Sequence, residues 1–284
     1  MEETCMLIDV GTNAEVVLGN RDWLIACAGA AGPALEGGVA RMGMRAGPGA
    51  IEHVRLDRQQ WRLEYATIDD TPPAGICGSG LIDLVAELYL ARIVDLRGKL
   101  QADADQGPAA RREFIRARLR EVDGEPAFIV APAAETAHGR PVVLSQVDLD
   151  AMMRSKAAMY AILTTLTGQV GVAFSDLAAI FVAGAFGRHI DPRQAIVLGM
   201  LPDLPLSTYR PLGNSSLKGA ELILLDEEAR RRSGEIGRRI TYIELNVNQE
   251  FMIRFSGSRF IPHTDPALFP SVPVFGNGRR AGKA

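Results

Sequence analysis

Short apolar runs separated by small polar turns dominate the first third of the chain. Runs of this kind are typical of β-strands, and Gly, Asn and Asp between them favour tight turns. The pattern predicts strands at about residues 6–9, 14–18, 23–27, 51–56 and 61–68. The first three form a β-meander because only short turns connect them, and a glycine-rich connector over 29–49 leads to the other two.

Helical spacing of apolar residues begins after residue 80. Leucines, a valine and a tyrosine recur at intervals of three and four from Leu81 to Tyr89, which is typical of one apolar helix face. Ser145 and Asp148 have the spacing of a capping box and predict a long helix that ends near residue 170. Asp191 and the proline after it are suited to start another helix. Two more helices are expected at about 215–232 and 248–255.

The run 177–183 is continuously apolar, which is typical of a buried central strand. Shorter strands are predicted at 128–130, 142–144 and 240–245. A meander followed by alternating helices and strands indicates the α/β class, with a mixed sheet flanked by helices.

Two stretches depart from this pattern. Residues 101–122 are polar and rich in arginine, with Phe114, Ile115, Leu119 and Val122 on one helical stripe. They predict an exposed amphipathic helix within an insertion at about 101–140. The chain from 262 onward is rich in proline and lacks periodicity, so we expect one domain over 1–262 and a frayed, disordered tail over 263–284.

Composition and charge narrow the class of protein further. There are 31 basic and 34 acidic residues, and the net charge of −3 gives no reason to expect nucleic acid or an anionic membrane as a partner. No apolar run approaches the roughly 20 residues that cross a bilayer, and the N-terminus lacks the pattern of a signal peptide. The expected location is the cytoplasm.

Cysteine and histidine spacing argues against a resident metal centre. Cys5, Cys27 and Cys77 are too scattered for a disulfide framework, a zinc site or an iron–sulfur cluster. The four histidines also lack ligand spacing. A metal held by protein groups alone is therefore not expected.

The positive chemical signal is the hairpin around Asp9. Walker, Rossmann, zincin and nucleophile-elbow signatures are missing from the sequence. A strand would deliver Asp9 to the edge of a sheet, Gly11 would let the turn approach a ligand, and Thr12 and Asn13 would offer donors to phosphate oxygens. Asp9 would then contact the hydration shell of a Mg²⁺ ion. A plain hairpin turn is the alternative interpretation.

Two glycine-rich loops are further candidates for a nucleotide site. Gly184, Ala185, Phe186 and Gly187 follow the buried strand, where small residues would admit an adenine–ribose group and the phenyl ring would wall the loop. Close packing of strand and helix is the alternative. The loop at the start of the first helix could bind an anion through free amides, or serve only as a structural turn. Its residues are Gly78, Ser79 and Gly80.

Several motifs together resemble the ASKHA (actin-like ATPase) superfamily and, within it, the C-terminal domain of RACo-type reductive activators of corrinoid proteins. The matching stretches are Ile8-Asp-Val-Gly-Thr-Asn-Ala-Glu15, Gly32-Pro-Ala-Leu-Glu-Gly37, Gly75-Ile-Cys-Gly-Ser-Gly-Leu-Ile-Asp83, Val182-Ala-Gly-Ala-Phe-Gly187, Leu198-Gly-Met-Leu-Pro202, Gly213-Asn-Ser-Ser216 and Phe260-Ile-Pro-His263. They span nearly the whole chain in order. The resemblance implies an actin-like (ribonuclease H-like) lobe whose ATP contacts include Asp9, Thr12, Asn13, Gly184 and Gly187, with Glu15 in the same hairpin.

The resemblance also implies a function. The family returns an oxidised cob(II)alamin centre in a corrinoid methyl-carrying protein to cob(I), with an electron from a ferredoxin-like iron–sulfur domain. That domain and the opposing actin-like lobe are not visible in this sequence, so we expect a fragment or a separately encoded half that is incomplete as an ATPase. The catalytic base is unassigned.

Three alternatives stay open. The domain could be a nucleotide-independent docking or dimerisation module. A homodimer is possible whether or not the domain binds nucleotide. It could instead be an actin-like small-molecule kinase, or an activator of acyl-CoA dehydratases, although the latter should carry cluster-binding cysteines.

Overall fold

The computed structural model describes residues 2–30, 40–101, 106–184 and 189–275, and confirms the α/β class. The strands are β1 (Cys5–Val10), β2 (Ala14–Gly19), β3 (Leu24–Gly29), β4 (Ala50–Asp57), β5 (Arg62–Thr67), β6 (Gly75–Ile76), β7 (Leu119–Val122), β8 (Glu125–Ala131), β9 (Val142–Ser145), β10 (Ala179–Ala183), β11 (Tyr209–Gly213) and β12 (Ile240–Tyr242). The α-helices are α1 (Gly78–Leu90), α2 (Ala109–Arg118), α3 (Gln146–Val170), α4 (Pro192–Leu198), α5 (Ser215–Leu225), α6 (Glu227–Arg239) and α7 (Gln249–Gly257).

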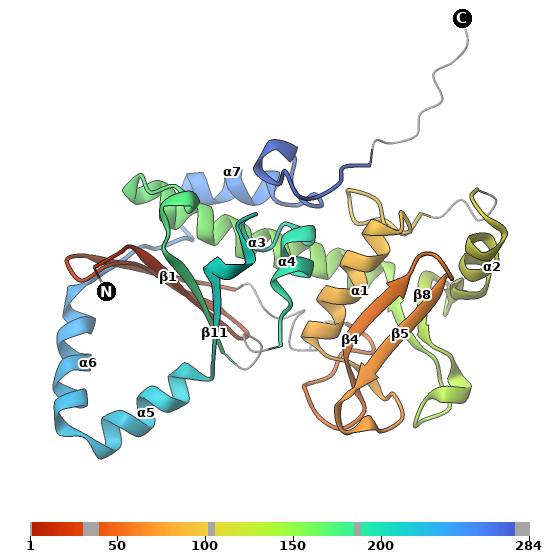
Figure 1. The fold of residues 1–284 in the computed structure, drawn as a ribbon, viewed down its shortest axis with the longest axis horizontal. Coiled ribbons are helices and arrows are strands. Elements are labelled where there is room, and N and C mark those ends of the chain that lie inside the picture. The colour runs from red at the N-terminus through yellow and green to blue at the C-terminus, as the bar shows by residue number, and fades with distance from the viewer. Residues whose placement is uncertain (1, 31–39, 102–105, 185–188, 276–284) are drawn as a thin grey trace, which may run out of the picture.

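A mixed six-stranded sheet forms the main body, in the order β11-β10-β1-β2-β3-β12. The predicted meander supplies the antiparallel strands β1, β2 and β3, while β10 and β11 add parallel to β1. Helix α3 lies along one face of this sheet, with α7 packed on its outer side (Figure 1). The strand side chains Met6, Ile8 and Val16 are fully buried in the resulting core.

The region between β3 and α3 forms a second part, with two three-stranded sheets in the orders β5-β4-β6 and β7-β8-β9. Helix α1 packs against β4 and also against α4 of the main body (Figure 1). The helix predicted from Leu81 to Tyr89 is confirmed, and it begins earlier, within the predicted glycine loop at Gly78. The two predicted strands are confirmed as the paired β4 and β5, and so is the capping box of α3.

The arginine-rich insertion differs from its prediction. Its helix ends at Arg118, and Leu119 and Val122 lie instead on strand β7, which pairs with β8. Phe114 and Ile115 are buried, and the Phe114 ring packs between Trp61 and Phe128. The same spacing of apolar residues fits a single amphipathic helix and also a helix followed by a strand. Periodicity alone therefore does not distinguish these two structures.

Three more sequence predictions differ from the structure near the C-terminus. The helix expected over 215–232 is a pair, because Asp226 ends α5 and caps α6. The strand expected over 240–245 stops at Tyr242. Residues 263–275, expected to be frayed, pack on the body: Phe269 is buried against Tyr160, with 5.2 Å between ring centroids.

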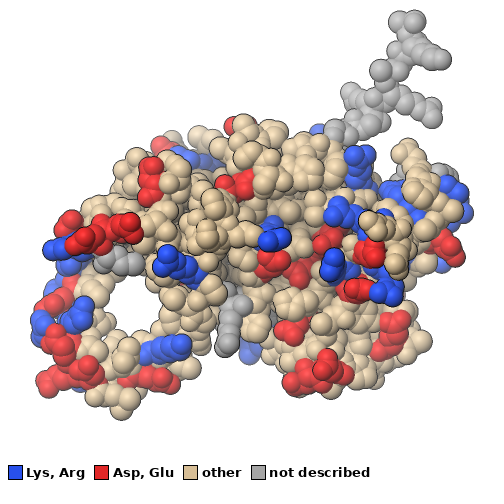
Figure 2. All heavy atoms as spheres, viewed as in Figure 1, with Lys and Arg blue, Asp and Glu red and all other residues tan. Residues whose placement is uncertain are grey.

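Helices α5 and α6 form an arm that stands away from the body. Figure 1 shows the arm leaving the end of β11 and returning at β12, and Figure 2 shows an opening between the arm and the sheet. No residue of either helix is buried. The exposed apolar side chains of the arm are Leu217, Leu222, Leu224, Leu225 and Ile236. No described helix has the length and apolarity needed to span a membrane.

Lys156 is fully buried in the middle of α3. Its Nζ donates to the carbonyl oxygens of Phe260, at 2.6 Å, and Pro262, at 2.7 Å. The bonds hold the 260–262 loop, which precedes the packed C-terminal segment, against the long helix. Burial lowers the pKa of Lys156 well below its ordinary value.

Replacing Lys156 with methionine should show how much these two hydrogen bonds contribute to the stability of the fold. The variant leaves two carbonyl groups without a donor, so the free energy of unfolding should fall by about 2 kcal/mol. Because the pKa of Lys156 is lowered in the folded state, the unfolded chain binds the proton more tightly, and this lysine's contribution to stability rises with pH towards its ordinary pKa. Urea unfolding at pH 7 and pH 9 should therefore give a larger difference between wild type and Lys156→Met at pH 9. An equal difference at both pH values would contradict this.

Candidate functional site

The carboxyl ends of three parallel strands meet at one edge of the main sheet. β1 pairs with β10 in a register that sets Asp9 opposite Ala183, and β10 pairs in turn with β11, with Ala183 opposite Gly213. Crevices at the carboxyl ends of such strands are the usual ligand-binding places of open α/β sheets. The register therefore brings the predicted acidic hairpin next to Gly184, the first residue of the predicted glycine loop.

Asp9 is held by the first turn of the arm. The hydroxyl of Ser216 donates to Asp9 Oδ2 at 2.6 Å. Asn214 caps α5 by accepting a bond from the Leu217 amide at 2.9 Å, which fixes the turn that carries Ser216. One carboxylate oxygen of Asp9 is thus oriented by the protein.

Gly184 follows β10 and lies next to Asp9. Its φ of +92° is in a region that favours glycine. A Cβ atom built on it would lie 2.4 Å from the Val10 carbonyl oxygen and 2.6 Å from Asp9 Oδ1. The Gly184 amide donates to the Gly213 carbonyl at 3.0 Å. Only a residue without a side chain fits between these strand ends. Ala185, Phe186 and Gly187, which complete the predicted loop, lie outside the described residues.

The hairpin between β1 and β2 has the predicted form. The Gly11 amide donates to the Asn13 carbonyl at 2.8 Å, and Glu15 stands opposite Asp9 on the neighbouring strand. Thr12, Asn13 and Glu15 are all exposed. The hairpin thus presents polar groups to solvent next to Asp9, as a phosphate-binding turn requires.

The glycine loop at the start of α1 is built into the second part of the molecule. Gly78, Ser79 and Gly80 are buried, and the Ser79 hydroxyl donates to the Glu52 carbonyl at 2.9 Å. A Cβ atom on Gly80 would lie 2.2 Å from the Ile51 carbonyl oxygen. Because these residues pack closely against β4, a larger side chain would not fit at Gly80. An anion contact at this loop stays a prediction.

A buried carboxylate follows this loop one turn along α1. Asp83 accepts hydrogen bonds at Oδ2 from the Val54 amide and from His53 Nδ1, each at 3.3 Å. Burial raises the pKa of Asp83 to about 6, and these two bonds offset part of the shift.

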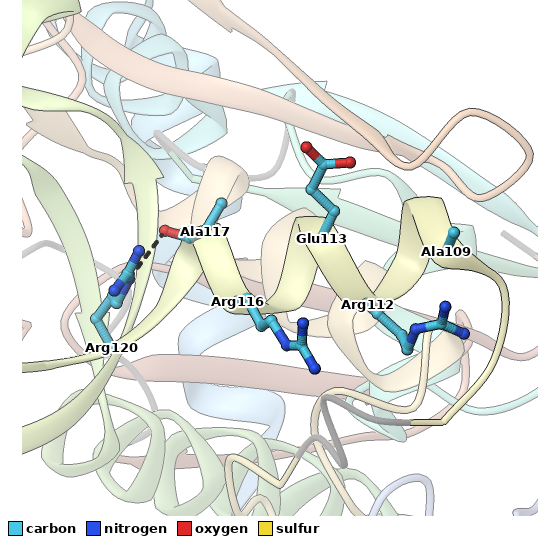
Figure 3. A pocket seen from close by; sticks show the side chains of 6 residues that line it. All are labelled: Ala109, Arg112, Glu113, Arg116, Ala117 and Arg120. Carbon is cyan, nitrogen blue, oxygen red and sulfur yellow. Dashed lines mark hydrogen bonds between the residues drawn. The ribbon is translucent and has the colours of Figure 1, made fainter.

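A shallow pocket lies along the outer face of α2, lined by Arg112, Glu113, Arg116 and Arg120 (Figure 3). Arg112 donates to the Gly107 carbonyl at 2.7 Å, and Arg120 contacts the Ala117 carbonyl at 3.5 Å. These arginines contact backbone of their own segment, which is the behaviour of a solvated polar helix face.

A family model described as the C-terminal domain of RACo, the ASKHA domain, matches residues 3–273. The chain belongs to this family. The chain is 35% identical over 249 residues to the corrinoid activation enzyme RamQ of Eubacterium limosum. The match covers 87% of this chain and 41% of that protein. The chain is 27% identical over 246 residues to a Methanosarcina barkeri reductase of the Co(II) methylated amine-specific corrinoid protein, covering 84% of this chain and 42% of the relative.

A solved structure gives the same result for the fold of this ASKHA domain. A reductive activator for a corrinoid, iron–sulfur protein matches with a TM-score of 0.88 and 41% identity, over 96% of this chain and 42% of that one. The chain thus spans about two fifths of the length of the proteins it matches.

Sequence reasoning missed Ser216 as a partner of Asp9. The signal was present as the Gly213-Asn-Ser-Ser216 stretch, in which glycine ends a strand and asparagine caps a helix. The two residues are separated by 207 positions, so their contact depends on strand order, which local patterns do not specify.

Replacing Gly184 with alanine should destabilise this ASKHA domain and displace Asp9. The new Cβ meets backbone at a positive φ, so the free energy of unfolding should fall by about 2 kcal/mol or more. Gly219→Ala on α5 is the matched control, since a Cβ there meets nothing within 4 Å and alanine favours a helix by up to about 1 kcal/mol. Thermal unfolding of both variants makes the comparison. Equal stability of the two would contradict the close approach at Gly184.

Proposed function

We propose that ATP with Mg²⁺ binds at the carboxyl ends of β1, β10 and β11. The observation that carries the proposal is the convergence of Asp9, the Gly11–Asn13 turn and Gly184, which lie far apart in sequence. Asp9 would contact the hydration shell of Mg²⁺ between the phosphates, oriented by Ser216. The turn would offer its donors to phosphate oxygens, and the backbone at Gly184 would lie against the nucleoside.

We propose further that ATP binding serves the reductive activation of a corrinoid protein. The matched relatives are named for corrinoid activation and for reduction of a Co(II) corrinoid protein. The proposed partner is a corrinoid methyl-carrying protein whose cobalt returns from cob(II) to cob(I). Nucleotide can assist such a transfer only through different affinities for two conformations, so ATP acts here as a conformational lever.

The electron would come from a ferredoxin-like iron–sulfur domain or donor outside this sequence. Its three cysteines are buried and free within the described residues. Burial raises the pKa of the Cys27 thiol to about 12, which opposes the thiolate form that a cluster requires. The chain's own contribution is therefore nucleotide binding and docking.

A second copy of the chain is the proposed partner of the α5–α6 arm. The arm exposes four leucines of α5, and Leu225 keeps 87% of its surface in solvent. Helix α6 begins with Glu227 and Glu228 and ends with Arg238 and Arg239. Two such helices related by a twofold axis place acidic ends beside basic ends, so the helix is complementary to a copy of itself.

Isothermal titration calorimetry with ATP and Mg²⁺ tests the nucleotide site. Asp9→Asn should weaken the Mg²⁺-dependent affinity at least tenfold, about 1.4 kcal/mol, because it removes the negative charge that faces the ion. Asp22→Asn, in an exposed turn, is the matched control and should bind as wild type does. No heat from folded wild type, even with the opposing lobe of a relative added, would reject the nucleotide role and favour the docking module.

Sedimentation velocity tests the arm. Wild type should sediment as a dimer, and Leu224→Glu with Leu225→Glu should shift it to a monomer because charge replaces the apolar contact. Both residues are exposed, so the variant should keep its circular dichroism spectrum. A wild type that stays monomeric at high micromolar concentration would overturn the second-copy proposal.

A further inference from the structure

Unpartnered polar atoms gather at one interface of the molecule. Within the described ranges, four buried side-chain nitrogen or oxygen atoms lack a hydrogen-bond partner. Three of them, Asp83 Oδ1, Glu87 Oε2 and Gln194 Oε1, belong to residues of α1 and α4, which pack together. A buried polar atom without a partner is destabilising, so three at one contact call for an explanation.

Each of the three side chains is fixed by its other polar atom. Gln194 Nε2 donates to Glu87 Oε1 at 3.0 Å, so the amide and carboxylate lie against each other across the interface. Asp83 precedes Glu87 by one helical turn, on the same face of α1. Its Oδ2 is occupied by the Val54 amide and His53, which leaves Oδ1 unused.

The chemistry of the unused atoms is uniform. All three are carboxyl or amide oxygens, which are hydrogen-bond acceptors. Asp83 is 5% exposed and Glu87 is 7% exposed, so bulk water does not solvate them freely. Asp191, which caps α4, adds negative charge near Asp83. The imidazoles nearby are His53, on Asp83, and His189, which lies 3.8 Å from Glu52; both are half exposed.

We propose that a hard divalent cation, Mg²⁺ or Ca²⁺, binds between α1 and α4, with Asp83, Glu87 and the amide oxygen of Gln194 as its protein ligands. Carboxylate and amide oxygens are the donors that these ions prefer, and water completes their coordination. Two carboxylates also balance the charge of the ion. Among the described residues no three His, Cys, Asp or Glu side chains form a metal-binding group, so the proposed site takes its third protein ligand from an amide.

The ion would connect the two parts of the molecule. Helix α1 belongs to the region inserted between β3 and α3, and α4 belongs to the main body that carries Asp9. The proposed ligands of this ion are different residues from those proposed to bind the nucleotide, and the site does not need ATP.

Manganese binding in the absence of nucleotide tests the proposal. Chelator-treated protein is titrated with Mn²⁺, and free Mn²⁺ is measured by electron paramagnetic resonance. One ion per chain should bind, and excess Mg²⁺ or Ca²⁺ should displace it. Asp83→Asn with Glu87→Gln should abolish this binding, and Glu87→Gln alone should weaken it at least tenfold. The single variant keeps the experiment decisive if the double variant fails to fold.

Asp9→Asn is the matched control because it removes a carboxylate from the proposed nucleotide site, and it should bind Mn²⁺ as wild type does. Folded wild type that binds no Mn²⁺ would overturn the proposal and assign the three oxygens to buried water. Binding that survives Glu87→Gln but is lost in Asp9→Asn would also overturn it. A loss of ATP binding in Asp9→Asn with Mn²⁺ retained separates this site from the proposed nucleotide function.

Discussion

The parallel pairing of β1 with β10 is the constraint on which the rest of the site depends. It joins a strand at residue 5 to one that starts at residue 179, and its register sets Asp9 beside the residue before Gly184. Because the two backbones approach closely there, the Val10 carbonyl and the Asp9 carboxylate occupy the space of a side chain at position 184. The pairing of β10 with β11 then delivers Ser216 to the same carboxylate.

The order of elements along the chain was predictable because each is marked locally. Ser145 and Asp148 cap α3, Asp191 caps α4, and alternating apolar residues mark the first strands. The errors fall where the deciding contact is distant. Phe114 and Val122 fit a helical stripe, but pairing with β8 turns the second into a strand residue. Phe269 lies in a proline-rich tail, and its burial depends on an aromatic contact with α3.

The candidate site was predictable only in pieces for the same reason. A glycine after an apolar strand indicates a tight loop, and an acidic hairpin indicates a ligand turn, but neither states that the two meet. Asp83 stood only at the end of a matching stretch, and nothing in the sequence joined it to Glu87 and Gln194, since an aspartate and a glutamate within an apolar helix are indistinguishable from solvated residues until burial is known. Strand order and helix packing supply what the sequence pattern lacks.

Helix α5 joins the exposed leucines of the arm to the candidate site. Its first turn contains Ser216, which contacts Asp9, and its last turn contains Leu224 and Leu225, which are exposed. An α-helix of this length transmits displacement along its axis with little bending, since each turn is fixed by backbone hydrogen bonds. In the proposed dimer, the leucines that meet the second copy would therefore lie on the same rigid helix that orients the Asp9 carboxylate. If nucleotide binding changes the affinity of the proposed dimer through α5, reciprocity of coupling requires dimerisation to change the affinity for nucleotide by the same factor.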